Sequence, residues 1–328
     1  MAHNSLLIAL ACTAALHSGL AGGQGGPGAY PAKPIRLVVT FPPGGSSDTV
    51  ARIVSPRLGE RLHQTIVIDN RPGGGGGIGA DIVAKAPADG HTLLVGAQGA
   101  MALNVLLYRS LPYDPLKDLA PVTLLITSPF VVAVNPSLIS ATSLRELIAL
   151  LKSKPGGTPF ASGGNGSGMH LAGELFRLMS ATQMIHVPYK GNGQALTDLA
   201  GGQVPVAFVD LASAMPFVKS GRIKVLAVAS AKRSVMAPDI PSAAESGLPG
   251  YEAFGWFGLV APAATPAQII ARLNADTVAV LQLADVRERL LAAGAEPAPC
   301  SAGEFTAFIR AEIGKWAKVV KDSGARVD

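Results

Sequence analysis

Cysteine is nearly absent from this chain, which has only Cys12 and Cys300 among its 328 residues. Cys12 lies in an N-terminal apolar stretch that we expect to be removed, so the remaining chain has no pair for a disulfide and no cysteine cluster for a metal. Charged residues make up 15% of the sequence, without a basic run, and the net charge is only +5. This composition argues against nucleic acid as a partner and suits a small anionic ligand.

The sequence also lacks the motifs of common catalytic chemistry. It contains no G-x-x-x-x-G-K-[ST] phosphate loop, no G-x-S-x-G nucleophile elbow and no H-E-x-x-H metal site. The glycines from Gly74 to Gly79 match G-x-G-x-x-G trivially, and the next expected strand, His91 to Ala97, ends without the acidic residue that holds a ribose. We expect no catalytic residue, no cofactor and no metal. An exported hydrolase or a nucleotide-dependent oxidoreductase stays as the enzymatic alternative.

One long apolar stretch is present, from Ser5 to Gly22, and small residues follow it. Its position and length predict a secretory signal peptide over residues 1–23, cleaved near residues 21–24. The first four residues carry no Lys or Arg, so a retained membrane anchor is the alternative.

From Pro34 onward, short β-branched runs alternate with helical periodicities, which predicts an α/β fold with mostly parallel sheets. The expected strands cover residues 35–41, 65–69, 91–97, 122–127, 130–134, 158–161, 184–187, 205–209 and 223–229. The expected helices cover residues 49–63, 78–86, 143–154, 168–181, 194–200, 211–220, 266–283, 284–293 and 302–323. The chain is long enough for two domains but has no single linker, so we expect a discontinuous arrangement.

The segment from Phe41 to Asp48 joins the first strand to the first helix through Pro42-Pro43-Gly44-Gly45. Ser46, Ser47 and Asp48 can each cap that helix. Free backbone N–H groups at the positive end of a helix dipole make an anion site. An ordinary strand-to-helix turn is the alternative.

Two later segments repeat this plan. Ser162 to Ser167 contains Asn165 and Gly166 and leads into a helix with His170 and Glu174 one turn apart, which we interpret as a structural pair because two ligands are too few for zinc. Tyr189 and Gly191 follow the next strand, and Asp210 follows another. Ligands bind at the carboxyl ends of strands in open α/β sheets.

Short motifs over residues 30 to 325 occur together: Tyr30-Pro31, Lys33-Pro34-Ile35, Phe41 to Gly45 with Asp48, Asn70 to Gly73, Asp89 to Leu94, Gly166-Ser167 with His170-Leu171, Val187 to Gly191, Pro238 and Pro241 with Glu245, Gly247 to Tyr251, and Trp256 with Gly258. In this combination the chain resembles the periplasmic substrate-binding components of tripartite tricarboxylate transporters, the Bug family.

The resemblance implies a type II periplasmic-binding-protein fold, with two α/β lobes and a ligand cleft between them. Crossings near Pro129 and Ser230 would assign residues 30–129 and 231–328 to the first lobe and residues 130–230 to the second. It further implies a periplasmic protein, expected to be a monomer, that binds a small carboxylate and passes it to membrane transporter subunits. A binding protein that senses the ligand for a signalling partner is a further alternative.

We expect one carboxylate of the ligand on Gly44, Gly45 and Ser46, and the other end under Asn165, Gly166 and Ser167. The affinity this requires predicts a dicarboxylate or an aromatic carboxylate. Gln98, in a segment that departs from the family pattern, is expected to discriminate among ligands, and Met101 to make that end of the pocket apolar. Phe41 and Trp256 are expected to supply a flat apolar wall, with a place in the core as the alternative. The expected ligand-binding residues are Phe41, Pro43, Gly44, Gly45, Ser46, Asp48, Gln98, Ser162, Asn165, Gly166, Ser167, His170, Tyr189, Gly191 and Asp210.

Overall fold

The computed structural model describes residues 30–154, 156–189 and 191–327. The expected signal peptide, residues 1–23, lies outside the described residues. No helix in the described part of the chain is long and apolar enough to cross a membrane.

The strands form one sheet in the order β2-β1-β3-β9-β4-β7-β5-β6, with β8 and β10 also paired to β4. Their bounds are β1 Ile35–Val39, β2 Ile66–Asn70, β3 Thr92–Ala97, β4 Leu119–Val134, β5 Thr158–Ser162, β6 Met184–Pro188, β7 Val206–Asp210, β8 Lys224–Val228, β9 Phe254–Pro262 and β10 Glu296–Pro297. The helices are α1 Ser46–Leu62, α2 Gly77–Ala84, α3 Asn104–Leu107, α4 Leu144–Ser153, α5 Gly168–Ser180, α6 Asn192–Ala200, α7 Leu211–Lys219, α8 Ala267–Leu281, α9 Ala284–Ala292 and α10 Ala302–Ser323.

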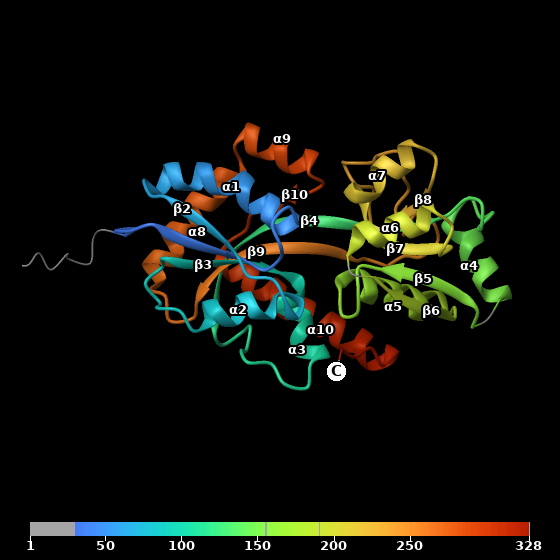
Figure 1. The fold of residues 1–328 in the computed structure, drawn as a ribbon, viewed down its shortest axis with the longest axis horizontal. Coiled ribbons are helices and arrows are strands. Elements are labelled where there is room, and N and C mark those ends of the chain that lie inside the picture. The colour runs from blue at the N-terminus through green and yellow to red at the C-terminus, as the bar shows by residue number, and fades with distance from the viewer. Residues whose placement is uncertain (1–29, 155, 190, 328) are drawn as a thin grey trace, which may run out of the picture. The chain divides into compact units, whose positions relative to one another are not determined.

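Two groups of strands meet on β4. The part of β4 from Leu119 to Pro129 pairs with β9, and the part from Phe130 to Val134 pairs with β7 and β8. We call the β1, β2, β3, β9 and β10 side the first lobe and the β5 to β8 side the second lobe. In Figure 1, β4 and β9 run side by side through the middle of the sheet.

Parallel pairing, which the alternating pattern predicts, holds in the outer strands of each lobe. The central pairs of β9 with β3 and β4, and of β4 with β7 and β8, are antiparallel. The expected break at Ser128-Pro129 is wrong, because β4 continues through it. Pro129 lies where β4 changes partners, a position that tolerates the missing N–H group.

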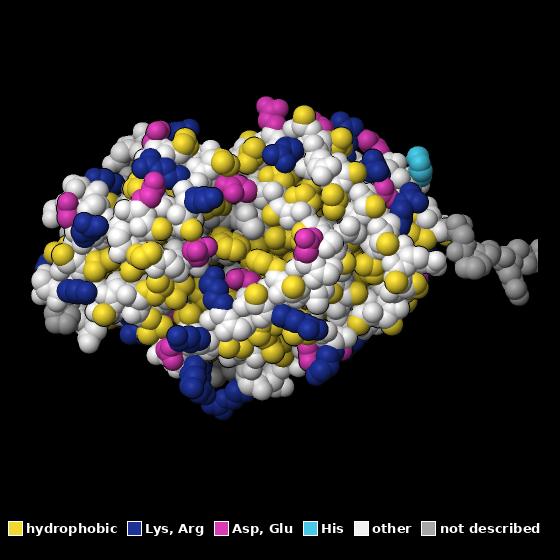
Figure 2. Space-filling view, turned by 180° about the vertical axis from the view of Figure 1, so that it is seen from behind, with side chains coloured by type: hydrophobic (Ala, Val, Ile, Leu, Met, Phe, Trp, Pro, Cys, Tyr) yellow, Lys and Arg dark blue, Asp and Glu magenta, His cyan; other side chains and the backbone are white. Residues whose placement is uncertain are grey.

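Helices cover both faces of the sheet (Figure 1). In the first lobe α1 packs against α8 and α9, while in the second lobe α6 packs against α7. Helix α10 joins the two hydrophobic cores: its first half contributes Phe305 and Ile309 to a core with Trp256, and its second half contributes Trp316 and Val319 to a core with Phe176. Figure 2 shows one face of the chain, where hydrophobic side chains surround a hollow and basic and acidic side chains are interspersed.

Candidate ligand-binding site

The expected site residues lie at the carboxyl ends of β1 and β3 in the first lobe and of β5, β6 and β7 in the second. Because the strands are parallel within each set, their carboxyl ends share one edge of each lobe. The expected site residues, which are far apart in the sequence, therefore lie together along one edge within each lobe.

The first-lobe loop, Phe41 to Asp48, is closed by a buried carboxylate. Asp48 is 2% exposed, and its Oδ2 accepts the Gly44 N–H at 2.9 Å and the Arg52 Nε–H at 2.8 Å. Its Oδ1 accepts from Asn70 Nδ2 at 3.0 Å. The Arg52 hydrogen bond is the main cause that lowers the pKa of Asp48 to about 2, with Gly44 and Asn70 acting in the same direction against burial.

This arrangement corrects the expected helix cap. The N-cap of α1 is Gly45, which has no side-chain cap, and Asp48 is the third helical residue. Its carboxylate reaches back to Gly44, whose left-handed φ of +81° suits glycine. Asp48 therefore holds the loop in shape.

Both glycine N–H groups of this loop have acceptors within the chain. The Gly44 N–H is bound to Asp48, and the Gly45 N–H is 3.1 Å from the Pro42 carbonyl oxygen. Helix geometry leaves the N–H groups of Ser46 and Ser47, in the first turn, without an intrahelical acceptor. Ser47 Oγ is buried and has no hydrogen-bond partner among the described residues.

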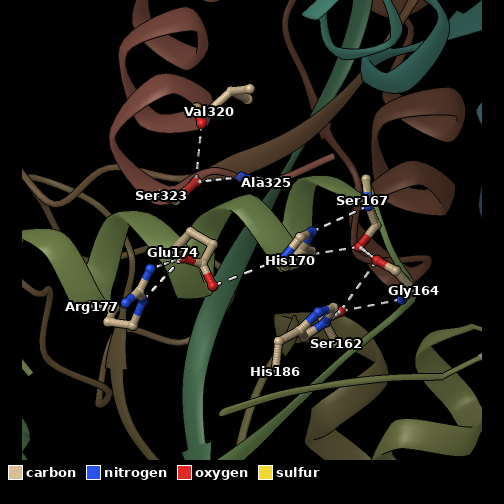
Figure 3. A network of polar contacts seen from close by, with 11 residues as sticks. Ser162, Gly164, Ser167, His170, Glu174, Arg177, His186, Val320, Ser323 and Ala325 are labelled. Carbon is tan, nitrogen blue, oxygen red and sulfur yellow. Dashed lines mark hydrogen bonds and ion pairs between the residues drawn. The ribbon is translucent and has the colours of Figure 1, made fainter. Parts of the chain in front are cut away.

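The second-lobe loop, Ser162 to Ser167, is closed by hydroxyl groups and a neutral imidazole (Figure 3). Ser167 caps α5: its Oγ accepts the His170 N–H at 3.1 Å and donates to the Gly164 carbonyl oxygen at 2.7 Å. His170 Nδ1 accepts the Gly166 N–H at 3.2 Å. An acceptor at Nδ1 places the proton of the neutral ring on Nε2.

A second histidine supports the first. The rings of His170 and His186 are stacked with centroids 3.9 Å apart, and His186 Nε2 lies 2.7 Å from Ser162 Oγ. Burial is the main cause that lowers the pKa of His170 to about 4 and that of His186 to about 3. Both rings are therefore neutral near pH 7. The ring that packs on His170 is His186 and not the expected partner, Glu174.

Glu174 is held by a different partner. It accepts two hydrogen bonds from Arg177, at 2.7 and 3.0 Å, while the nearest His170 nitrogen is 3.9 Å away. In the described part of the chain, no group of three His, Cys, Asp or Glu side chains could hold a metal ion.

Tyr189, Gly191 and Asp210 lie on the second-lobe edge, as their strands require. A Cβ added to Gly164 would lie 2.9 Å from the Tyr189 carbonyl oxygen, so the β5–α5 and β6–α6 loops touch. Asp210 lies opposite Phe130 of β4, and Ser128 Oγ donates to it at 3.4 Å. Burial raises the pKa of Asp210 to about 6.

Gln98, Met101 and Trp256 are all buried in the structure. Gln98 is 4% exposed and its Nε2 donates to Glu312 Oε2 at 2.8 Å. Met101 and Trp256 are fully buried in the first-lobe core, so neither forms an exposed pocket wall. Phe41, by contrast, is 38% exposed beside the first-lobe loop.

Asn192 was missed by the sequence analysis. It is the first residue of α6, and both its side-chain polar atoms are shielded from solvent without a partner among the described residues. A Cβ on Gly163 would lie 3.6 Å from its backbone nitrogen, so Asn192 adjoins the second-lobe loop. Its only sequence signal was its place after Gly191 at a helix start.

Two α/β lobes joined by long central strands, with a glycine loop at strand ends in each lobe, are typical of the periplasmic solute-binding class of proteins. A model of the tripartite tricarboxylate transporter family receptor matches residues 50–325. The chain belongs to this family.

Individual relatives agree with this assignment. Protein BugT of Bordetella pertussis is 40% identical over 299 residues, which covers 91% of each chain. The structure of Rpa4515 of R. palustris with adipate has 39% identity and a TM-score of 0.82, covering 91% of this chain and all of that one. MatC of Rhodopseudomonas palustris with bound malate has 34% identity and a TM-score of 0.77, covering 89% of this chain and all of that one.

Proposed function

We propose that this protein captures a small dicarboxylate between its two lobes in the periplasm and delivers it to the membrane subunits of a tripartite transporter. The observation that carries the proposal is the pair of preformed loops at helix starts, one per lobe. Similar proteins hold adipate and malate, both dicarboxylates. We propose export through the N-terminal signal peptide, a monomeric state and no catalytic activity.

Because some N–H groups of the first-lobe loop already have acceptors within the chain, the proposed ligand anchor moves along the loop. One ligand carboxylate would accept from Ser46 and Ser47, because Gly44 and Gly45 donate to Asp48 and Pro42. The other end would lie near the second-lobe loop, with exposed Asn165 and the shielded amide of Asn192 as polar partners.

Affinity favours two anchors over one. A hydrogen bond to a charged group contributes roughly 1.5–3 kcal/mol. Micromolar binding requires about 8 kcal/mol net, after several are lost to immobilisation. One carboxylate on one loop falls short, whereas two carboxylates or one carboxylate with apolar burial against Phe41 suffice.

The proposed lobe boundaries, near Pro129 and Ser230, are supported by strand pairing. β4 changes partners between Pro129 and Phe130, and Ala229, just after β8, donates to the Phe130 carbonyl oxygen. The second half of α10 packs in the second-lobe core, so this helix is shared by the two lobes.

Ligand class is tested by unfolding the mature chain with adipate, malate, benzoate and adipamide. A carboxylate at one hundred times its dissociation constant stabilises the protein by about 2.7 kcal/mol. We expect this from a dicarboxylate and not from adipamide, its uncharged analogue. No stabilisation by any carboxylate would overturn the proposal.

The binding mode is tested with Ser46→Pro, which removes one N–H group at a position where helices accept proline. Gly45 has extended backbone angles that suit a residue before proline. We expect dicarboxylate affinity to fall roughly 10- to 100-fold, the value of one charge-assisted hydrogen bond. Ala302→Pro, at the first residue of α10 after an extended Ser301, is the matched control and should bind normally.

Delivery is tested in a strain lacking the protein. Loss of uptake of the bound carboxylate supports transport. Normal uptake with a lost transcriptional response would favour the sensing alternative, and conversion of the ligand by purified protein would favour an enzyme.

A further inference from the structure

One buried carboxylate oxygen joins three distant segments of the chain. Glu312 of α10 is 5% exposed, and its Oε2 accepts from Gln98 Nε2 at 2.8 Å and from the indole nitrogens of Trp256 and Trp316 at 3.0 Å each. Lys315 donates to Oε1 at 3.5 Å. A buried carboxylate with this many donors has a defined orientation, so it also orients the groups that donate to it.

The Glu312 contact fixes which way the Gln98 amide faces. Because Nε2 is bound to Glu312, Oε1 faces the opposite direction, toward the first residue of α5. A Cβ added to Gly168 would lie 2.4 Å from Gln98 Oε1 and 3.1 Å from the Phe130 ring. Gln98 belongs to the first lobe and Gly168 to the second, so this is a direct contact between lobes.

Glu312 lies near the middle of the part of α10 that connects the two hydrophobic cores. Phe305 and Ile309, before it, pack in the first-lobe core, and Trp316 and Val319, after it, pack in the second-lobe core. Glu312 therefore lies where the helix passes from one core to the other, beside the contact between Gln98 and Gly168.

We propose that Gln98 is a stop for lobe closure and that Glu312 is the residue that positions it. The amide oxygen of Gln98 sets how closely the end of β3 approaches the start of α5. Gly168 is required because any side chain there would occupy the space of the stop. Gln98 thus acts on the geometry of the cleft without contacting the ligand.

The two tryptophans provide a spectroscopic signature, since they are the only ones in the chain and both donate to Glu312. A change in the spacing of the lobes at Gln98 alters the surroundings of both indoles. Intrinsic fluorescence therefore reports on the stop.

The test compares Gly168→Ala, Gln98→Ala and the double variant in ligand-free mature protein, so that it does not depend on the proposed ligand. We expect Gly168→Ala to increase the radius of gyration in X-ray scattering and to shift tryptophan emission. Adding Gln98→Ala should return the radius of gyration to the wild-type value. Gly303→Ala, whose added Cβ meets nothing within 4 Å in the first turn of α10, is the control and should change neither.

Stability gives a second measurement that remains valid if Gly168→Ala folds poorly. The destabilisation caused by Gly168→Ala should be at least halved in the Gln98→Ala background. An equal cost in both backgrounds, or a wild-type radius of gyration for Gly168→Ala, would overturn the proposal.

Discussion

The first-lobe and second-lobe loops follow one plan, a strand, a glycine turn and a helix start, but different chemistry holds each in shape. In the first lobe an ionised Asp48 gathers Gly44, Arg52 and Asn70. In the second lobe a neutral His170 and the hydroxyl of Ser167 bind the loop backbone. Two loops with the same backbone plan therefore depend on opposite protonation behaviour. The first-lobe loop requires an ionised side chain, and the second-lobe loop requires a neutral one.

The largest expected difference between the two loops is in how the free energy of unfolding responds to a fall in pH. The pKa of His170 is lowered from 6.5 to about 4 in the folded protein, so unfolded His170 takes up a proton first as the pH falls. The free energy of unfolding should fall by about 3 kcal/mol between pH 6.5 and pH 4 from this residue. Asp48, with its pKa lowered from 3.8 to about 2, contributes a loss only below about pH 4.

Urea unfolding from pH 7 to pH 4 measures this loss. His170→Asn keeps an acceptor for Gly166 without titrating and should reduce the pH dependence, while His186, whose pKa is also lowered by burial, still contributes its own share. His63→Asn is the control, because His63 is exposed and has a left-handed backbone that Asn accommodates. An unchanged slope in His170→Asn would contradict the comparison.

Removing the first-lobe carboxylate should have the next largest effect. Asp48→Ala removes the acceptor of the Gly44 N–H and one of the two acceptors of the Asn70 amide, which still donates to the Phe41 carbonyl oxygen. It should cost about 2–3 kcal/mol of unfolding free energy at pH 7. Asp285→Ala, which breaks an exposed ion pair with Arg57, should leave thermal stability nearly unchanged. Equal melting temperatures for the two variants would remove the claim that Asp48 organises its loop.

Replacing a turn glycine by alanine should give a smaller difference in stability between the two loops. Gly44 and Gly166 both have left-handed φ angles, but an added Cβ meets nothing within 4 Å at Gly44 and lies 2.7 Å from Val327 at Gly166. Gly166→Ala should therefore cost about 1–2 kcal/mol more than Gly44→Ala in chemical denaturation, because overpacking adds to strain. A reversed order would show that the second-lobe loop relaxes more freely than its contacts suggest.

The helix cap should give the smallest effect. Ser167→Ala removes the side-chain cap of α5 and should cost about 1 kcal/mol. Ser143→Ala removes the corresponding cap of α4, away from both loops, at a similar cost. Calorimetric titration should find weaker dicarboxylate binding only for Ser167→Ala, and equal binding in both variants would separate the cap from the site.

Much of the fold could be predicted from local pattern. The strand and helix alternation, including β1, α1 and β5 to α7, follows short apolar runs punctuated by glycine, and the structure confirms it. β9 was missed because Phe254–Pro262 combines three aromatic residues, three aliphatic residues and two glycines without an alternating pattern. Residues 99–107 were expected to be irregular, yet a π-helical turn and α3 form there, buried against α2 and α10.

For the candidate site, the sequence predicts the loops that follow strand ends but not the contacts that shape them. The loops were found because glycine and serine before a helix are local signals. The partners that shape them were not, since Gln98 and Glu312 are 214 residues apart, and His170 and His186 meet only when β6 pairs beside β5. Long-range pairs of this kind leave no periodicity in the sequence.

The long antiparallel contact of β4 and β9 also bears on the order in which the chain acquires its structure. The strands of the second lobe are contiguous in sequence, whereas β3 and the first part of β4 must wait for β9, which is made much later. Contiguous segments pair sooner because less chain entropy is lost in bringing them together. As the polypeptide emerges from its N-terminus, the strands of the second lobe can pair while the first lobe still exposes unpaired strand edges, although the second-lobe core is completed only when Trp316 and Val319 arrive. That interval is when the chain is most prone to aggregate.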